Sequence, residues 1–382
     1  SRPGAGGPPG DRRRRGPPPG GPRRPGAAPG RGAQGPTAGG GPGGPALFPS
    51  LRPVPPAELW KEPRLALLYT AEGTYPLTRI RESFLVSPKG DSAPFLVQEN
   101  TAEFAGWTSR GELLLSGFKE WCSAAGGFSG NLSSVRDVQL AHYLVHPDVR
   151  GHQPSDILNK KEGSLAERAS DLFAAWDKVV SEPHYKEVEP LLSRIETPLS
   201  PVLSRMERNG FAADAEGLRR MDRDLAAQLM AIERTIQEVT GEQINLNSPK
   251  QVGELLFNVL RLPVIRKTKT GFSTDVLVLE ELSRLPDPLN KIPRLMLEYR
   301  ELSKLQSSFV APYLKLSEEG DGVIRSTFEQ AATGTGRLAS HNPNVQTVPL
   351  FGEWAQRFRS CLVPVVRGNS FVAADYSQIA KI

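Results

Sequence analysis

The sequence is poor in cysteine and has no long apolar run. Its 382 residues include two cysteines, Cys122 and Cys361, which lie far apart and belong to no CxxC or CxxH pattern. This spacing argues against a disulfide scaffold and a cysteine-based zinc site, and it predicts two reduced thiols inside a cell. No apolar run approaches the roughly 18 residues of a membrane-spanning helix, so we expect no membrane contact.

Acidic residues are nearly absent from the first 45 positions, where Asp11 is the one acid among eight arginines. The net charge of +5 therefore comes from this segment, and the rest of the chain is slightly acidic. Apolar side chains are scarce while Gly and Pro are frequent, so residues 1–45 are predicted to be disordered. A solvated extension and a polyanion tether both remain open. An organelle-targeting role is opposed by Gly and Pro, which disfavour the amphipathic helix that mitochondrial import requires.

Residues 60–185 have the pattern of a mixed α/β domain. Short apolar runs bounded by turn residues predict strands, and longer stretches of mixed polarity predict helices. The strands are expected within 64–73, 92–99 and 111–118, and the helices within 137–147 and 164–180. Strands followed by helices are typical of a domain in which the helices cover a sheet.

This domain lacks carboxylates where a metal-dependent exonuclease would need them. Such an enzyme holds two cations between several acids, but the first strand ends in Tyr69-Thr70-Ala71, where an Asp-x-Glu would be required. The pair His142 and His146 has a spacing that can bind zinc, but no third ligand is apparent, so no metal site is predicted there. The remaining acids are interpreted as surface or capping residues: Asp137, Asp156 and Asp171.

Residues 186–320 are predicted to be helical. Apolar residues recur at helical spacing between 188 and 206 and again between 218 and 239, and Gly210 and Gly241 mark the ends of the two runs. Asp214 is in position to cap the second helix, and the prolines inside the first run predict a kink or break. We expect these two helices to pack as a long antiparallel pair.

Two polar features of this segment suit nucleic acid. Asn245, Asn247 and Ser248 precede a helix start in which Ser248 is the expected N-cap and Gln251 completes a capping box, so backbone N–H groups could meet an anion. Plain capping is the simpler alternative. Further along, Arg300 and Lys304 share a helix face with two serines, which matches a sugar–phosphate track. A solvated face would show the same pattern.

Two long motifs close the sequence. Residues 333–349 read TGTGRLASHNPNVQTVP, and residues 375–379 read DYSQI. Together they resemble family A DNA polymerases, the bacterial DNA polymerase I group, which carries T-x-T-G-R-L-S-S-x-x-P-N-L-Q-N-[IV]-P and then D-Y-S-Q-I-E-L-R. The family's N-L-N-S and Y-R-E-L-x-K-L motifs also match residues 245–248 and 299–305. The resemblance is strong after residue 186 and weak before it.

The resemblance implies a multi-domain protein of the α/β and α classes. After the disordered tail it would comprise a degenerate 3′–5′ exonuclease-like domain (60–185), a helical thumb (186–320) and the beginning of the polymerase palm (321–382). The implied function is template-directed nucleotidyl transfer in DNA replication and repair, on primer–template DNA with deoxynucleoside triphosphates and two Mg²⁺ ions. A bacterial cytoplasm is the expected location, with an organelle as the alternative.

The resemblance also assigns roles to residues. Asp375 is similar to the first metal-binding carboxylate of the palm, and the Tyr376 carbonyl would help to hold a cation. The expected DNA contacts are Asn245, Asn247, Ser248, Arg300, Lys304, Arg337, Asn344 and Gln346.

The sequence departs from the family at Ala380, where the family has the glutamate that excludes ribonucleotides. The family's second carboxylate and its triphosphate-binding helix have no counterpart before Ile382. We therefore expect a polymerase fragment that is inactive by itself. The alternative is a non-catalytic DNA-binding module. An active 3′–5′ exonuclease is disfavoured by Tyr69-Thr70-Ala71.

Overall fold

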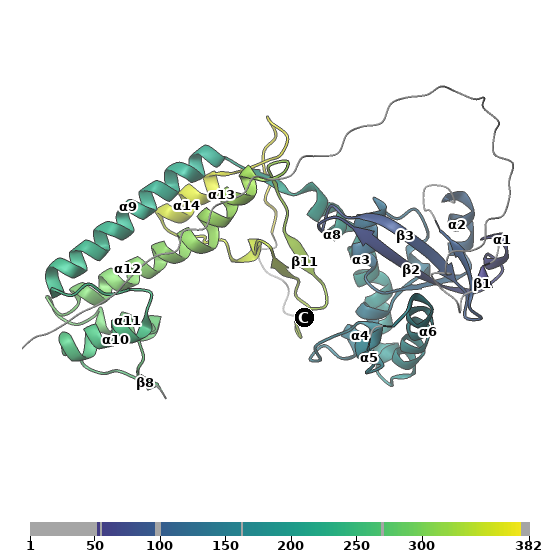
Figure 1. Cartoon of the computed structure of the whole chain (residues 1–382), viewed down its shortest axis with the longest axis horizontal. Coiled ribbons are helices and arrows are strands. Elements are labelled where there is room, and N and C mark those ends of the chain that lie inside the picture. The colour runs from purple at the N-terminus through teal and green to yellow at the C-terminus, as the bar shows by residue number, and fades with distance from the viewer. Residues whose placement is uncertain (1–51, 54–55, 96–100, 162, 269–270, 376–382) are drawn as a thin grey trace, which may run out of the picture. The chain divides into compact units, whose positions relative to one another are not determined.

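The computed structural model of the chain describes residues 52–53, 56–95, 101–161, 163–268 and 271–375. The predicted disordered tail and Tyr376 lie outside these residues. The described chain is mixed α/β and contains one six-stranded sheet, several small sheets and many helices (Figure 1). No helix in the described part of the chain has the length and apolarity that crossing a membrane would require.

A six-stranded mixed sheet forms the core of what we call the sheet region, residues 52–181. Its strands lie in the order β1 (Arg52–Pro53), β4 (Asp91–Pro94), β3 (Arg79–Val86), β2 (Arg64–Glu72), β5 (Glu112–Leu115) and β6 (Val135–Asp137). Strand β2 pairs antiparallel with β3 and parallel with β5. The helical elements of the region are α1 (Pro56–Leu59), α2 (Thr101–Thr108), α3 (Phe118–Ala125), the 3₁₀ turn η1 (Leu132–Ser134), α4 (Val138–Val145), α5 (Pro154–Ile157) and α6 (Leu165–Ser181).

Both faces of this sheet are covered by helices. Along β2, Leu65 and Leu67 point into a core with α2 and α3, while Ala66 and Leu68 point into a second core with α4, α5 and α6. This alternation follows from the two-residue period of a strand and explains why β2 reads as a continuous apolar run. The expected mixed α/β architecture is thus observed, and the elements that the sequence did not reveal include β3, β6, α2, α3 and α5.

A second set of helices forms what we call the helical region, residues 185–318. Its elements are α7 (Tyr185–Leu191), the π-helical turn η2 (Leu192–Glu196), α8 (Thr197–Asn209), α9 (Ala215–Thr240), α10 (Pro249–Gly253), η3 (Glu254–Val259), α11 (Val276–Leu282), α12 (Lys291–Leu305), η4 (Gln306–Val310) and α13 (Ala311–Glu318). Strands β8 (Lys267–Thr268) and β9 (Gly271–Phe272) pair antiparallel as a two-stranded ribbon. No break is observed where the prolines predicted a kink or break: the backbone stays helical from α7 through the π-helical turn η2 into α8, which contains Pro198 and Pro201.

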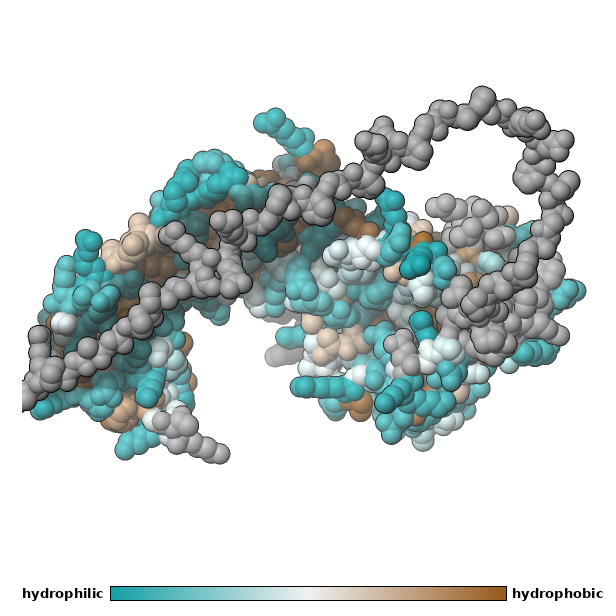
Figure 2. Space-filling model, in the orientation of Figure 1, coloured by the Kyte–Doolittle hydropathy of each residue, from teal (hydrophilic) through white to brown (hydrophobic). Residues whose placement is uncertain are grey.

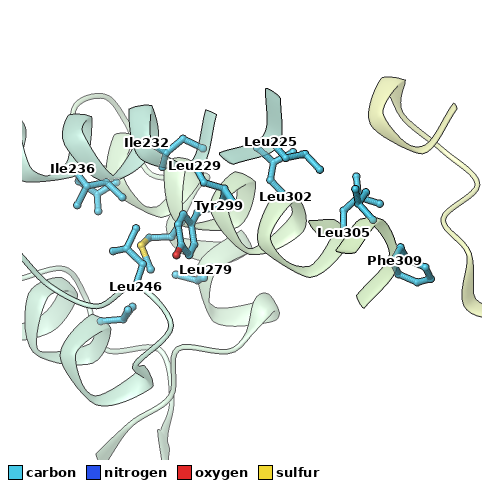
Figure 3. Close-up of a cluster of buried hydrophobic side chains, with 14 of the residues drawn as sticks. Leu225, Leu229, Ile232, Ile236, Leu246, Leu279, Tyr299, Leu302, Leu305 and Phe309 are labelled. Carbon is cyan, nitrogen blue, oxygen red and sulfur yellow. The ribbon is translucent and has the colours of Figure 1, made fainter. Parts of the chain in front are cut away.

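Helix α9 lies along α12 (Figure 1) and carries the apolar stripe that the sequence predicted. Its inward side chains, Leu225, Leu229, Ile232 and Ile236 among them, meet Tyr299, Leu302, Leu305 and Phe309 from α12 and η4 (Figure 3). The face drawn in Figure 2 is largely hydrophilic over these helices, as expected for amphipathic helices with one buried side.

The predicted antiparallel pairing of the first two long helices is wrong. Helix α8 packs against α3 of the sheet region, while α9 packs against α12 and α13. An apolar stripe shows that a helix has a buried face, but it does not identify the element that covers it. Asp214 does occupy the N-cap position of α9, although its side chain makes no capping hydrogen bond.

A three-stranded sheet follows α8. Its middle strand, β7 (Phe211–Ala213), pairs with β10 (Val323–Ile324) and β13 (Leu362–Val363), and α14 (Glu353–Ser360) precedes β13. Gly210 connects α8 to β7 with φ of 56°, and a Cβ there would overlap the carbonyl oxygen of Ile324. Only glycine therefore allows the chain to turn from α8 directly into a paired strand.

Two buried tyrosines in the helical region differ in hydrogen bonding. Tyr313 is 0 % exposed, and its hydroxyl has no hydrogen-bond partner among the described residues; burial raises its pKa to about 12. The Tyr299 hydroxyl accepts from Asn247 Nδ2 and donates to Glu233 Oε1, at 3.1 Å each. A buried polar atom without a partner costs free energy, whereas one with partners contributes to stability.

Replacing each tyrosine with phenylalanine should therefore shift stability in opposite directions. Tyr313→Phe is expected to raise the free energy of unfolding by about 1 kcal/mol, and Tyr299→Phe to lower it by about 1–2 kcal/mol because Glu233 loses its donor. Urea unfolding followed by circular dichroism measures both variants. A shift of the two variants in the same direction would contradict this account of the two hydroxyls.

Candidate nucleic-acid interface

The motif beginning at Thr333 lies in the loop of a short hairpin. Strands β11 (Thr327–Glu329) and β12 (Ala339–His341) pair antiparallel, and the loop between them spans residues 330–338. Thr333 Oγ1 donates to the Arg337 carbonyl at 2.7 Å, and Gly336, with φ of 74°, donates its N–H to the Thr333 carbonyl at 3.3 Å. These bonds close the loop and leave the Arg337 side chain exposed, with no ion-pair partner in the described chain.

The second half of the motif folds back on this loop. Asn344 Oδ1 accepts from Ser340 Oγ at 2.9 Å and from the Gln346 N–H at 3.1 Å, which caps the 3₁₀ turn η5 (Val345–Thr347). Gln346 Nε2 donates to the Leu338 carbonyl at 2.9 Å. Arg337, Asn344 and Gln346, predicted separately as DNA contacts, are therefore held in one hydrogen-bonded unit, and all three side chains are exposed.

A groove of about 1000 Å³ borders this unit. Gln346 lines it together with apolar side chains that include Phe211, Tyr313, Phe328 and Val348. A largely apolar wall beside exposed amides and a guanidinium can pack against flat rings or sugars while the polar groups bind phosphates.

Arg300 and Lys304 do not share one environment, although they share a helix face. The Arg300 guanidinium is half-buried and donates to both the carbonyl and the hydroxyl of Thr274, and burial lowers its pKa. It therefore ties α12 to the segment before α11. Lys304 is exposed, and its ammonium has no ion-pair partner among the described side chains. Of the two, Lys304 is the cation available to an external phosphate.

The predicted helix start at Ser248 is observed, with one correction. Ser248 is the N-cap of α10, and its hydroxyl accepts from the Gln251 N–H at 3.4 Å. The Gln251 side chain, however, accepts from the Asn245 N–H at 2.7 Å rather than from Ser248, because the Ser248 N–H already bonds the Asn245 carbonyl. Asn247 donates to the Tyr299 hydroxyl. Asn245, Asn247 and Ser248 thus belong to one turn, which the Asn247–Tyr299 hydrogen bond ties to α12. The side chains of Asn245 and Asn247 are exposed.

The end of strand β2 holds no acids arranged around a metal. The Tyr69 hydroxyl donates to the Gly117 carbonyl at 3.2 Å and lines a pocket of about 590 Å³ with Glu120, Arg168 and Asp171. No group of three or more His, Cys, Asp or Glu side chains is placed to hold a metal ion in the part of the chain that the structure describes.

Of the three acids interpreted as surface or capping residues, Asp137 and Asp156 are caps, whereas Asp171 is buried within α6, which contradicts the interpretation for that residue. Asp137 is the N-cap of α4 and also accepts from the backbone N–H groups of Gly117 and Phe118; burial raises its pKa to about 6. Asp156 completes the capping box of α5, and Asp171 accepts from Lys160 at 2.7 Å.

Asp375 is the last described residue and is exposed. A carboxylate is a suitable ligand for a hard cation such as Mg²⁺, but a two-metal centre needs further carboxylates. Among the described residues, no group of three or more His, Cys, Asp or Glu side chains is placed to hold a metal ion, so these residues do not by themselves fit such a centre.

Comparison with known proteins matches this part of the chain to a family. The model of DNA polymerase family A matches residues 215–380. Two relatives are the DNA polymerase I proteins of Geobacillus stearothermophilus, 40 % identical over 215 residues, and Caldicellulosiruptor bescii, 34 % identical over 260 residues. These alignments cover 56 % and 66 % of this chain but 24 % and 30 % of the relatives, so the chain spans about a quarter to a third of their length.

A solved structure is similar to a larger part of the chain. The POL domain of Pol1 from M. smegmatis, in complex with DNA primer–template and dNTP, matches with a TM-score of 0.71 and 27 % identity. The match covers 80 % of this chain and 56 % of that chain. It therefore extends beyond the residues that the family A model covers.

The Asn344 carboxamide can be tested as the centre of the family A motif. Asn344→Ala removes the acceptor shared by Ser340 and Gln346, so the Gln346 amide should exchange its hydrogen about fivefold faster, equivalent to about 1 kcal/mol. Asn344→Asp keeps an acceptor oxygen and should leave the rate within twofold of the unchanged chain. Hydrogen exchange read by NMR decides this. Equal rates in the two variants would contradict the capping role.

Proposed function

We propose that this chain is part of a DNA-directed DNA polymerase and that it supplies primer–template contacts of that enzyme. The observation that carries the proposal is the folded motif of residues 333–349, in which Arg337, Asn344 and Gln346 are exposed on one hydrogen-bonded unit. The family assignment and the DNA-bound structural relative support it. In this proposal residues 60–185 are a degenerate 3′–5′ exonuclease-like domain, residues 186–320 are the helical thumb, and residues 321–382 begin the palm.

The geometry indicates what each exposed group would do. Arg337 carries a guanidinium suited to bind a phosphate through two parallel hydrogen bonds. Asn344 uses its oxygen internally and keeps its Nδ2 donors for DNA, whereas Gln346 uses Nε2 internally and keeps its Oε1 acceptor. Lys304 would contact the backbone of the duplex as a point charge.

Asp375 would be the first of the carboxylates that bind Mg²⁺ in the complete enzyme. The deoxynucleoside triphosphate would bind beside Asp375. A protein that acts on chromosomal DNA would work in the bacterial cytoplasm or in an organelle.

The salt dependence of DNA binding tests the proposed contacts. Each cation that neutralises a phosphate contributes roughly one to the slope of log affinity against log salt concentration. Lys304→Ala and Arg337→Ala are each expected to reduce that slope by about one, measured by fluorescence anisotropy with a labelled primer–template duplex. Arg219→Ala is the control, because Arg219 is already paired with Glu216 and Glu318, and its slope should not change. If the slopes of the Lys304→Ala and Arg337→Ala variants are unchanged, as in the control, Lys304 and Arg337 do not contact DNA phosphates.

Primer extension tests whether catalysis requires palm residues beyond those of this chain. The 382-residue chain should bind the duplex without extending it in the presence of Mg²⁺ and all four deoxynucleotides, because it has one palm carboxylate and the two-metal geometry needs more. Templated extension that is lost in Asp375→Ala would overturn the proposal that further palm residues are required.

A further inference from the structure

The hairpin that carries Arg337 is too small to hold its own conformation. Its ladder pairs three residues of β11 with three of β12. An isolated two-stranded hairpin is at best marginally stable in water, and the loop of residues 330–338 adds further entropy to its closure. The orientation of Arg337 must therefore be fixed by other parts of the chain.

A buried ion pair occupies the outer edge of β11. Lys119, from α3 of the sheet region, donates to Glu207 Oε1 on α8 and to the Phe328 carbonyl, both at 2.8 Å. Glu207 Oε1 in turn accepts from the Phe328 N–H at 2.7 Å. Lys119 is 4 % exposed and Glu207 1 % exposed. In an antiparallel pair, every second residue points its backbone N–H and C=O away from the paired strand. Phe328 is such a residue, and Lys119 and Glu207 bind these two groups as a neighbouring strand would.

An ion pair suits this position better than an apolar pair would. Burying two opposite charges costs about as much free energy as their attraction returns, so stability alone does not favour them over hydrophobic residues. A buried edge, however, needs one acceptor for its N–H and one donor for its C=O. Glu207 and Lys119 supply these at Phe328, and Tyr75 donates its hydroxyl to the second Glu207 oxygen.

The loop is held at two further points. Gln330, at its start, donates to Glu196 and accepts from Ser200 Oγ at 2.9 Å. The Tyr143 hydroxyl, from α4 of the sheet region, donates to the Thr333 carbonyl at 2.6 Å, four residues before Arg337. The Tyr143 ring packs edge-on against His152, with 5.7 Å between ring centroids, which fixes the direction of the hydroxyl.

We propose that the sheet region serves as a brace for the loop of residues 330–338, and that Tyr143 and the Lys119–Glu207 pair are positioning residues for Arg337. The brace needs no catalytic chemistry in the sheet region, where no group of three or more His, Cys, Asp or Glu side chains is placed to hold a metal among the described residues. The expected effect of the brace on DNA affinity rests on the proposed function, but its effect on the hydrogen exchange of residues 330–338 does not.

Hydrogen exchange measures the brace without DNA. In the full chain, Tyr143→Phe removes one hydroxyl and keeps the ring, and the peptide amides of residues 330–338 should exchange about fivefold faster. Tyr69→Phe is the matched control, since it removes a hydroxyl that also donates to a backbone carbonyl, that of Gly117 within the sheet region. The control should leave this loop unchanged, and peptides of α9 should be unchanged in both variants. Equal exchange of the loop in the two variants would overturn the proposal.

A second variant tests the ion pair. Lys119→Met combined with Glu207→Gln removes both charges and the donor to Phe328, while the glutamine oxygen can still accept from the Phe328 N–H. Exchange across residues 327–338 should increase in this variant as well. If the loop remains as protected as in the unchanged chain, the pair does not hold the hairpin, and that part of the proposal falls.

A double-mutant cycle tests whether the brace acts through Arg337. With a fluorescein-labelled primer–template, Tyr143→Phe should weaken binding about threefold or more, and in the Arg337→Ala background it should have an effect of less than about twofold. The same loss in both backgrounds would show that Tyr143 does not position Arg337. If Arg337→Ala binds DNA as tightly as the unchanged chain, the proposed DNA contact fails, and the exchange experiment alone decides the brace.

Discussion

The carboxylate of Glu207 is the group around which three segments of the chain meet. It is almost completely buried in α8, and an unpaired charge in that position would cost several kcal/mol. Its oxygens accept hydrogen bonds from three donors: Lys119 of α3, Tyr75 of the loop after β2 and the Phe328 N–H of β11. The Glu207 carboxylate is therefore fully paired only when α8 contacts both the sheet region and the hairpin. The arrangement of these three segments thus depends on this one buried charge.

Packing around α8 reinforces this requirement. Ser204 and Ser123, one from each helix, form a buried hydrogen bond of 2.9 Å between α8 and α3, and Ser200 reaches Gln330. Small hydroxyl residues allow the two helices to approach closely while leaving no buried hydroxyl without a partner at these points. The α8–α3 contact thus has buried polar pairs at its centre, whereas the α9–α12 contact is built mainly on apolar side chains and adds the Tyr299–Glu233 hydrogen bond. The polar pairs fix a register that hydrophobic packing alone would leave less defined.

The sequence predicted the local structure of the helical region closely. Asp214 and Gly241 mark the two ends of α9, and Ser248 begins α10 as expected, because capping and periodicity depend on neighbouring residues. The partners of distant segments were not predictable in this way. Nothing in the residues around Lys119 shows that its ammonium would be buried against a strand some 200 positions later, and Arg300 resembled a surface cation until Thr274 was seen to accept from it.

The same contrast applies to the candidate site. The motif containing Arg337, Asn344 and Gln346 was predicted from its residues and is brought together by short-range hydrogen bonds. Tyr143 was not singled out, since a tyrosine on an amphipathic helix carries no signal of what its hydroxyl will reach. Residues whose role depends on long-range contacts therefore had to be found in the structure, whereas residues whose role depends on the local turn could be found in the sequence.

Strand β7 has a consequence for the order in which the chain acquires structure. It leaves α8 through Gly210, yet both strands that pair with it lie more than 100 residues further along. The sheet region, by contrast, completes its ladders within residues 52–137. During synthesis the sheet region can fold as soon as it emerges, while β7 presents two unpaired edges until the whole of α9 to α13 has been made. Contacts of such separation form slowly and expose strand edges in the interval, so the ribosome-bound chain would pass through a stage in which its first half is folded and its small sheet still awaits partners.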